Sequence, residues 1–169
     1  MLMEATLNAK SALDGVVDVQ IAPYVANSLL DDDDARALLF EAIEMGLDRI
    51  GSADLLLGGI GAGTAEGKQI DQTIDEWFAI ATEYDLDLDV HIQDHGSLGA
   101  YTIEQLVRAT GAHDYEGRVT GSHCYSLGDL PDDWRTKIIE MVAVVIFMFT
   151  SATISIILVR QSSGRSPSE

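Results

Sequence analysis

Two histidines stand where predicted strands end. His91 closes the alternating run 86–91, and His123 closes the run 117–123, one strand and one helix further along the chain. Neighbouring parallel strands lie ~4.8 Å apart, so the two imidazoles could share one ion or one substrate at the carboxyl edge of a sheet. Neutral imidazole is a good ligand for zinc or ferrous iron. Alternatively, the two histidines are unrelated polar residues that each end a strand.

Three other side chains near these histidines carry weaker signals. Asp94 follows His91 by three residues, so its carboxylate could reach the same strand end and shuttle protons. We expect His95 and His113 to be solvent-facing or structural. Cys124 could be a redox or metal-tuning thiol, but a small buried hydrophobic residue is the simpler interpretation.

A sheet is needed to bring these residues together, and the chain alternates strand and helix patterns. Strands are expected at residues 16–23, 48–52, 86–91 and 117–123, and helices at 31–45, 69–84, 102–109 and from Pro131 onward. Such alternation predicts right-handed βαβ units and a parallel sheet. A doubly wound sheet is the alternative from periodicity alone.

The charge balance excludes some functions. The chain has 28 acidic and 10 basic side chains, for a net charge of −18, which argues against a nucleic-acid-binding surface. An Asp-rich, Lys-poor surface suits high salt, so we expect a halophilic source, with an ordinary acidic protein as the alternative. Cys124 is the single cysteine, which excludes an internal disulfide and predicts a cytoplasmic location.

The composition changes at about Met141. Residues 141–159 carry no charge, and a helix of this length at 1.5 Å per residue just spans a bilayer core of about 30 Å. We therefore expect an apolar helix there, which could be a transmembrane segment giving membrane association. Residues 160–169 are Ser-rich and are expected to be a disordered tail.

The strand-end motifs also resemble a known family. Residues 89–94 (Asp-Val-His-Ile-Gln-Asp), with residues 117–123 (Gly-Arg-Val-Thr-Gly-Ser-His) about thirty positions later, look like the strand-five and strand-six signatures of cytosine deaminases in the amidohydrolase superfamily. Residues 18–23, 46–51 and 83–85 fall where that family has its third strand, its fourth strand and the helix before strand five. The resemblance covers about residues 15–134 and implies a partial TIM-type (β/α)8 barrel over residues 1–140.

The resemblance implies a metal-dependent hydrolase acting on C–N bonds, other than peptide bonds, of a cyclic amide or amidine such as cytosine. His91 matches the metal ligand on strand five. His123 matches the strand-six histidine, which belongs to the metal site and faces substrate and bound water. Asp94 matches the proton-shuttling acid, where cytosine deaminases use glutamate. A divalent ion, zinc or iron, would activate the water, and an acid would protonate the departing nitrogen.

Parts of the family pattern are missing from the chain. It has no His-x-His pair, nothing after Ala143 resembles strands seven and eight, and residues 24–27 offer no clear counterpart of the substrate-gripping glutamine. A complete barrel takes about 250 residues. Three interpretations follow: an inactive or incomplete fragment, truncated or changed in reading frame near Ala143; a membrane-anchored acidic non-catalytic protein; or a half-barrel completed by a second chain, since an open sheet exposes its edges.

Overall fold

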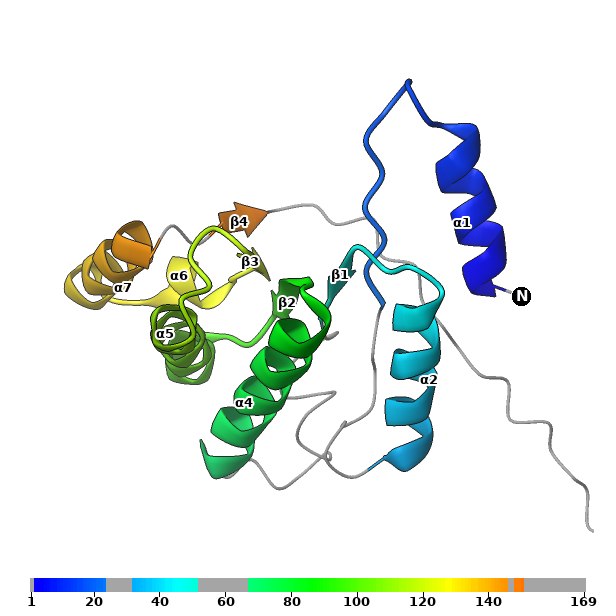
Figure 1. Cartoon of the computed structure of the whole chain (residues 1–169). Helices are drawn as coiled ribbons and strands as arrows, with labels where there is room; N and C mark the ends of the chain where they lie inside the picture. The colour runs from blue at the N-terminus through cyan, green and yellow to red at the C-terminus, as the bar shows by residue number, and fades with distance from the viewer. Residues whose placement is uncertain (1, 24–31, 52–66, 146–147, 151–169) are drawn as a thin grey trace, which may run out of the picture.

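The computed structural model describes residues 2–23, 32–51, 67–145 and 148–150 (Figure 1). In chain order the elements are α1 (Leu2–Ala12), α2 (Asp33–Glu44), β1 (Arg49–Ile50), α4 (Gly67–Tyr84), β2 (Asp87–Ile92), α5 (Gly96–Ala112), β3 (Val119–His123), α6 (Ser126–Asp129), α7 (Asp132–Val145) and β4 (Met148–Thr150). The described chain therefore has an α/β fold.

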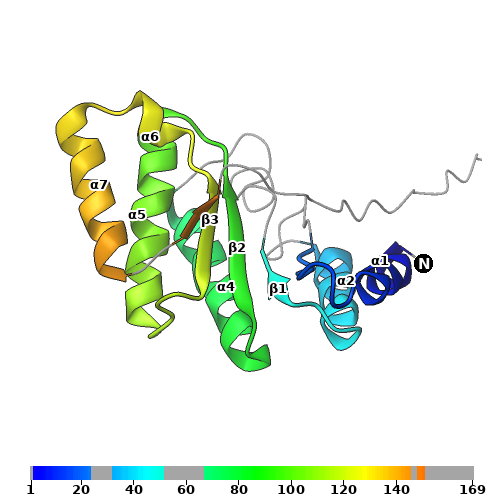
Figure 2. The same ribbon diagram turned by 90° about the horizontal axis from the view of Figure 1, so that it is seen from above.

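The four described strands form one parallel sheet in the order β1-β2-β3-β4. Helices α4, α5 and α7 connect them in turn and lie on the same side of β2 and β3 (Figure 2). A doubly wound sheet reverses its strand order at a switch point, whereas the order of the described strands runs in one direction. This arrangement matches the predicted barrel segment and not the doubly wound alternative.

The helix-covered face of the sheet forms the core. Leu88, Val90 and Ile92 alternate along β2 and are at most 1 % exposed. They belong to one buried cluster with Trp77 and Phe78 of α4, the pair for which the sequence predicted a packing role. Burying each of these side chains contributes on the order of 1.5–3 kcal/mol relative to leaving it in water. This packing fixes the strands that carry the candidate site.

The opposite face of the sheet is polar. Asp89 and His91 alternate with the core residues of β2, and the strand register places Thr120 and Ser122 of β3 opposite them. Ser122 Oγ donates a hydrogen bond of 2.6 Å to Asp89 Oδ1, and Arg49 Nη1 donates one of 2.9 Å to Thr120 Oγ1. Polar contacts therefore link the three strands on this face, which also carries His91.

The helix starts agree with the sequence at α2 and differ at α5. The side chain of Asp32 caps α2 by accepting from the backbone N–H of Ala35 at 2.9 Å, as the acidic run predicted. Helix α5 begins at Gly96, six residues before the expected cap, Thr102. Thr102 Oγ1 instead donates to the carbonyl of Leu98 at 3.1 Å. A threonine can satisfy its hydroxyl in this way inside a helix, so the expected cap was wrong.

The predicted first strand is not formed. Residues 16–23 follow α1, a helix that the sequence reading missed, and show only an isolated bridge at Pro23. The carbonyl of Ile21 accepts from the backbone N–H groups of Asp48 and Arg49 at 3.0 and 3.2 Å, while Val16 is 81 % exposed. β-branched residues favour a strand only where a neighbouring strand packs against them, and in the described chain only the end of this run lies beside β1.

The expected apolar helix over residues 141–159 is wrong at its centre. Helix α7 ends at Val145, and Met148–Thr150 form β4, which pairs in parallel with β3. A continuous apolar run is also typical of a parallel strand covered on both faces, so the sequence alone could not separate the two. None of the helices in the described ranges is long and apolar enough to cross a membrane. Residues 151–159 and the expected tail, 160–169, lie outside the described residues.

Candidate active site

His91 and His123 meet at the carboxyl ends of β2 and β3. His123 Nε2 lies 3.2 Å from His91 Nδ1, and the ring centroids are 5.0 Å apart at an angle of 64°. His91 is buried, at 7 % exposure, and His123 is half-buried. The structure thus brings together the two histidines that the sequence singled out, while their chemical roles stay predictions.

A break in strand geometry brings His123 to this contact. The register places His123 opposite Ile92, so regular alternation would send its side chain toward the helices. His123 instead has φ +72° and Cys124 has φ +50°. Left-handed backbone is uncommon for residues other than glycine and is typical of functional sites. The turn redirects the imidazole from the core face to His91.

Asp94 lies on the segment that leads from β2 into α5 and is half-buried. A close approach fixes this segment, because a Cβ on Gly99 would come within 2.2 Å of the carbonyl oxygen of Asp94 and 2.9 Å of Ser126 Oγ. Gly99 therefore packs the segment after β2 against the start of α6. Asp94 is thereby held at the same edge of the sheet as the two histidines.

Tyr125 and Asp129, which the sequence did not single out, extend the contacts of the histidine pair through His95. The Tyr125 ring lies 5.3 Å from His123 and stacks on His95 at 5.6 Å with an angle of 26°. His95 Nδ1 lies 2.5 Å from Asp129 Oδ2. The only sequence signal for Tyr125 was its place two residues after a strand-end histidine. His95, expected to be solvent-facing or structural, is exposed and takes part in this contact.

Comparison with known proteins shows similarity to hydrolases. No family model matches the chain. N-isopropylammelide isopropyl amidohydrolase of Pseudomonas sp. (strain ADP) is 33% identical over 139 residues, which are 82% of this chain and 32% of that protein. Pterin deaminase of Rhizobium rhizogenes is 28% identical over 88 residues, or 52% of this chain and 20% of that protein.

Solved structures show a similar relationship. The crystal structure of N-isopropylammelide isopropylaminohydrolase from Burkholderia multivorans matches with a TM-score of 0.76 and 28% identity, over 87% of this chain and 36% of that one. This chain belongs to the amidohydrolase superfamily. The 5-methylcytosine deaminase of Klebsiella pneumoniae shares the fold, with a TM-score of 0.70 and 21% identity, over 87% of this chain and 34% of that one. The chain spans about a third or less of the length of these amidohydrolase relatives.

A divalent metal is common in amidohydrolases, and the described residues fit part of such a site. Two nitrogens that each bind a tetrahedral zinc at 2.0–2.1 Å lie about 3.3 Å apart, and His123 Nε2 and His91 Nδ1 are separated by 3.2 Å. A catalytic zinc usually has three protein ligands. Within the described ranges, no cluster of three His, Cys, Asp or Glu side chains could hold an ion, so these residues do not complete the site.

Cys124 adds no thiolate ligand beside this histidine pair. The thiol is 4 % exposed, and burial raises its pKa to about 12. A thiol needs a lowered pKa to act as a nucleophile or metal ligand at neutral pH. Cys124 therefore behaves as the small buried residue that the sequence favoured.

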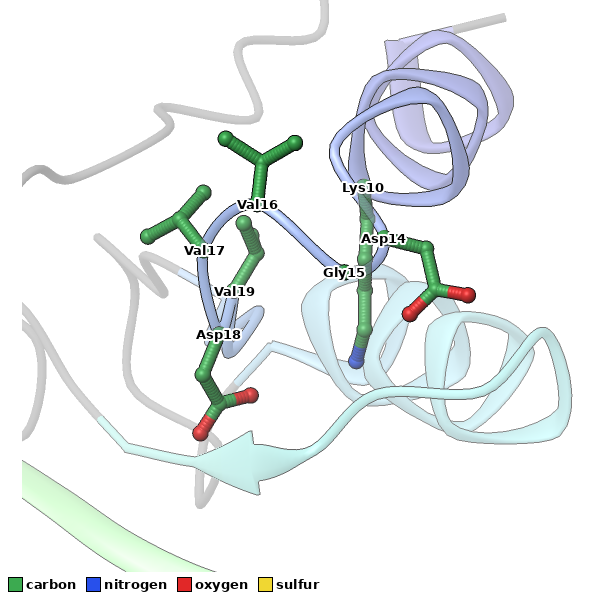
Figure 3. A pocket seen from close by; sticks show the side chains of 7 residues that line it. All are labelled: Lys10, Asp14, Gly15, Val16, Val17, Asp18 and Val19. Atoms are coloured by element: carbon green, nitrogen blue, oxygen red, sulfur yellow. The ribbon is translucent and has the colours of Figure 1, made fainter.

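Two surface hollows lie on other parts of the molecule. Lys10, Asp14 and residues 15–19 line one of about 390 Å³, in which Lys10 runs between Asp14 and Asp18 in the view of Figure 3. Lys10 is already paired with Asp48. A groove of about 560 Å³ is lined by residues of α5 and α7, among them Glu104 and Trp134. Neither of these two hollows is lined by a histidine.

Proposed function

We propose that this chain carries the middle strands of a hydrolase that cleaves C–N bonds, other than peptide bonds, in a cyclic amide or amidine. The observation that carries the proposal is the 3.2 Å approach of His91 and His123 at the carboxyl ends of adjacent parallel strands, the edge where barrel enzymes place their chemistry. The names of its relatives, an isopropyl amidohydrolase, a pterin deaminase and a cytosine-type deaminase, support this class of reaction.

Each residue has a separate role in this proposal. His91 is the ligand to a divalent ion, zinc or iron, which would supply an activated water when bound. His123, turned toward His91 by its left-handed backbone, belongs to the same site and faces the substrate. Asp94 moves a proton between the reacting nitrogen and solvent.

The remaining ligands would come from further strands. Among the described strands, β1 and β4 each have a neighbour on one side only, and an exposed strand edge is a template for pairing with more chain. We propose that strands carrying the other ligands pair at these edges, whether they belong to a longer polypeptide or to a complementary barrel half. The rest of the substrate pocket would be supplied by the same strands.

The proposed function can be tested in a chimera. Residues 15–134 would replace the matching segment of the Pseudomonas relative, and hydrolysis of N-isopropylammelide and bound metal would be measured. We expect activity and metal in the chimera, a loss of both on His91→Ala, and a loss of activity of about 100-fold or more on His123→Ala or Asp94→Asn.

His113→Ala is the matched control, because His113 follows the opposite end of α5 and is exposed. This variant should keep both the metal and the activity. If His91→Ala and His123→Ala changed neither metal content nor activity, the assignment of the site would be wrong.

A further inference from the structure

Tyr125 occupies an unusual place beside the histidine pair. It follows β3 by two residues and immediately precedes α6, and α6 packs against α5 (Figure 2). Its ring is flanked by His123 at 5.3 Å and by His95 at 5.6 Å. Tyr125 is nevertheless 47 % exposed, so nearly half of a large aromatic side chain faces solvent at the carboxyl edge of the sheet.

The neighbours of Tyr125 fix its ring in place. His95, which stacks on it, belongs to the segment after β2 and contacts Asp129 at the end of α6 at 2.5 Å. Gly99 packs the same two segments together, against Asp94 and Ser126. The tyrosine is therefore held between two βα segments, and ordering it on ligand binding would cost little side-chain entropy.

We propose that Tyr125 is a substrate-contacting residue whose ring forms a wall for a planar, nitrogen-rich heterocycle beside His123. The inference rests on the proposed function, because it places the ring of the cyclic amide or amidine next to the histidine pair. Aromatic side chains prefer stacked or edge-to-face contacts with other rings, and every nucleobase-like ring offers a face for such contact. Tyr125 would thereby select flat rings over open-chain amides.

The experiment is a ¹⁹F NMR titration of 5-fluorocytosine with the 169-residue chain. The probe is a planar cyclic amidine, and it is the ligand in one solved structure that shares this fold. We expect its resonance to shift and broaden with the intact chain. Tyr125→Leu should weaken the apparent affinity by about tenfold, since the leucine side chain cannot stack on the heterocycle as an aromatic ring does. Tyr125→Phe should keep the affinity within about twofold, because the ring is retained.

His113→Leu serves as the control, since it removes another stacked imidazole, 4.8 Å from Phe78, beyond the far end of α5. It should leave the titration unchanged. Absence of any perturbation of the probe by the intact chain overturns the inference, and so does an equal loss in the Phe and Leu variants, which would assign the contact to the hydroxyl. A Tyr125-dependent titration together with an inactive chimera would separate failure of the proposed function from failure of this contact.

Discussion

The amino ends and the carboxyl ends of β2 and β3 are held by different kinds of contact. At the amino ends, Arg118 donates from Nε to Asp87 and from Nη1 to Asp85, each at 2.8 Å. Its guanidinium also lies 4.5 Å from the ring centre of Tyr115. The hydrogen bond to Asp87 is the main cause that raises the pKa of Arg118. This end is a network of opposite charges around a buried ring.

Tyr115 adds buried hydrogen bonds to the amino end. Its side chain is buried, and its hydroxyl lies 2.8 Å from the carbonyl oxygens of both Ala81 and Leu86, to which it donates. Burial raises the pKa of Tyr115, while the positive charge of Arg118 opposes that effect. The hydroxyl thus ties the end of α4 to the segment before β2.

The carboxyl ends carry imidazoles and a half-exposed tyrosine in place of such a network. Left-handed backbone occurs near both ends, at Asp85 and Asp114 as well as at His123 and Cys124, so the ends differ in their side chains, and at the carboxyl end Tyr125 leaves apolar surface in water. The difference indicates that one end of the sheet supplies stability while the other carries the candidate site, the division that is typical of barrel proteins.

The sharpest test of this difference exchanges the two tyrosines for alanine. Tyr115→Ala removes a buried ring and its hydroxyl contacts, so we expect it to lower the free energy of unfolding by about 3–5 kcal/mol. Tyr125→Ala should change it by at most about 0.5 kcal/mol, as for other exposed sites. Urea unfolding followed by far-ultraviolet circular dichroism measures both.

Equal losses in the two tyrosine variants would contradict the division of roles between the ends of the sheet. A large loss from Tyr125→Ala alone would show that the carboxyl end is also structural. Tyr115→Phe separates the ring from the hydroxyl, because it should cost only about 1 kcal/mol, the net value of one hydrogen bond.

Sequence patterns predicted the core better than the carboxyl end. Apolar alternation over residues 86–91 and helical spacing around Trp77 and Phe78 located elements that the structure confirms, because burial imposes a period on the chain. The apolar run containing Met148 was assigned to a helix and contains β4, because an apolar run without polar alternation does not by itself distinguish a strand from a helix.

At the site, the sequence could place His91 and His123 on neighbouring strands but could not predict their direct contact. Regular alternation would point the His123 side chain toward the helix-covered face of the sheet. Its left-handed backbone, with φ +72°, explains why the imidazole lies against His91 instead. Tyr125 and His95 meet through the packing of α5 against α6, a tertiary contact that leaves no periodic trace. Local patterns therefore identify candidate residues, whereas the geometry at the carboxyl ends of the strands depends on contacts between segments.

Gly99 allows a test of how tightly the two βα segments pack at the carboxyl end of the sheet. Alanine would suit the interior of α5 by propensity, yet its Cβ would lie 2.2 Å from the carbonyl oxygen of Asp94. We expect Gly99→Ala to lower the free energy of unfolding by about 1–3 kcal/mol through overpacking. In the ¹⁹F titration it should also weaken 5-fluorocytosine binding, since it displaces the segment that carries His95.

The control for Gly99→Ala is Gly128→Ala in α6, where an added Cβ meets nothing within 4 Å. This change should be neutral, or stabilising by up to about 1 kcal/mol through a less flexible unfolded chain. If Gly99→Ala were equally neutral, the two βα segments would not be packed as tightly as the carboxyl end requires.

The smallest expected effect concerns two polar side-chain contacts, one at each end of the sheet. His95 and Asp129 have side chains that are 71% and 45% exposed, against 35%/33% for Arg118 and Asp87. Double-mutant cycles with His95→Gln and Asp129→Asn should give a coupling of about 0.2–0.5 kcal/mol that falls with added salt. The cycle with Arg118→Met and Asp87→Asn should give about 1 kcal/mol, because its charge-assisted bonds are less exposed to water.

A coupling free energy at His95–Asp129 as large as that at Arg118–Asp87 would show that the carboxyl-end pair stabilises the fold. A small coupling, combined with weaker 5-fluorocytosine binding in Asp129→Asn, would instead assign the pair to orienting the His95 ring against Tyr125. Stability and ligand binding respond differently because an exposed pair gains little free energy against water while still selecting one orientation of the imidazole. The two readouts together therefore decide whether the carboxyl end is organised for binding or only for folding.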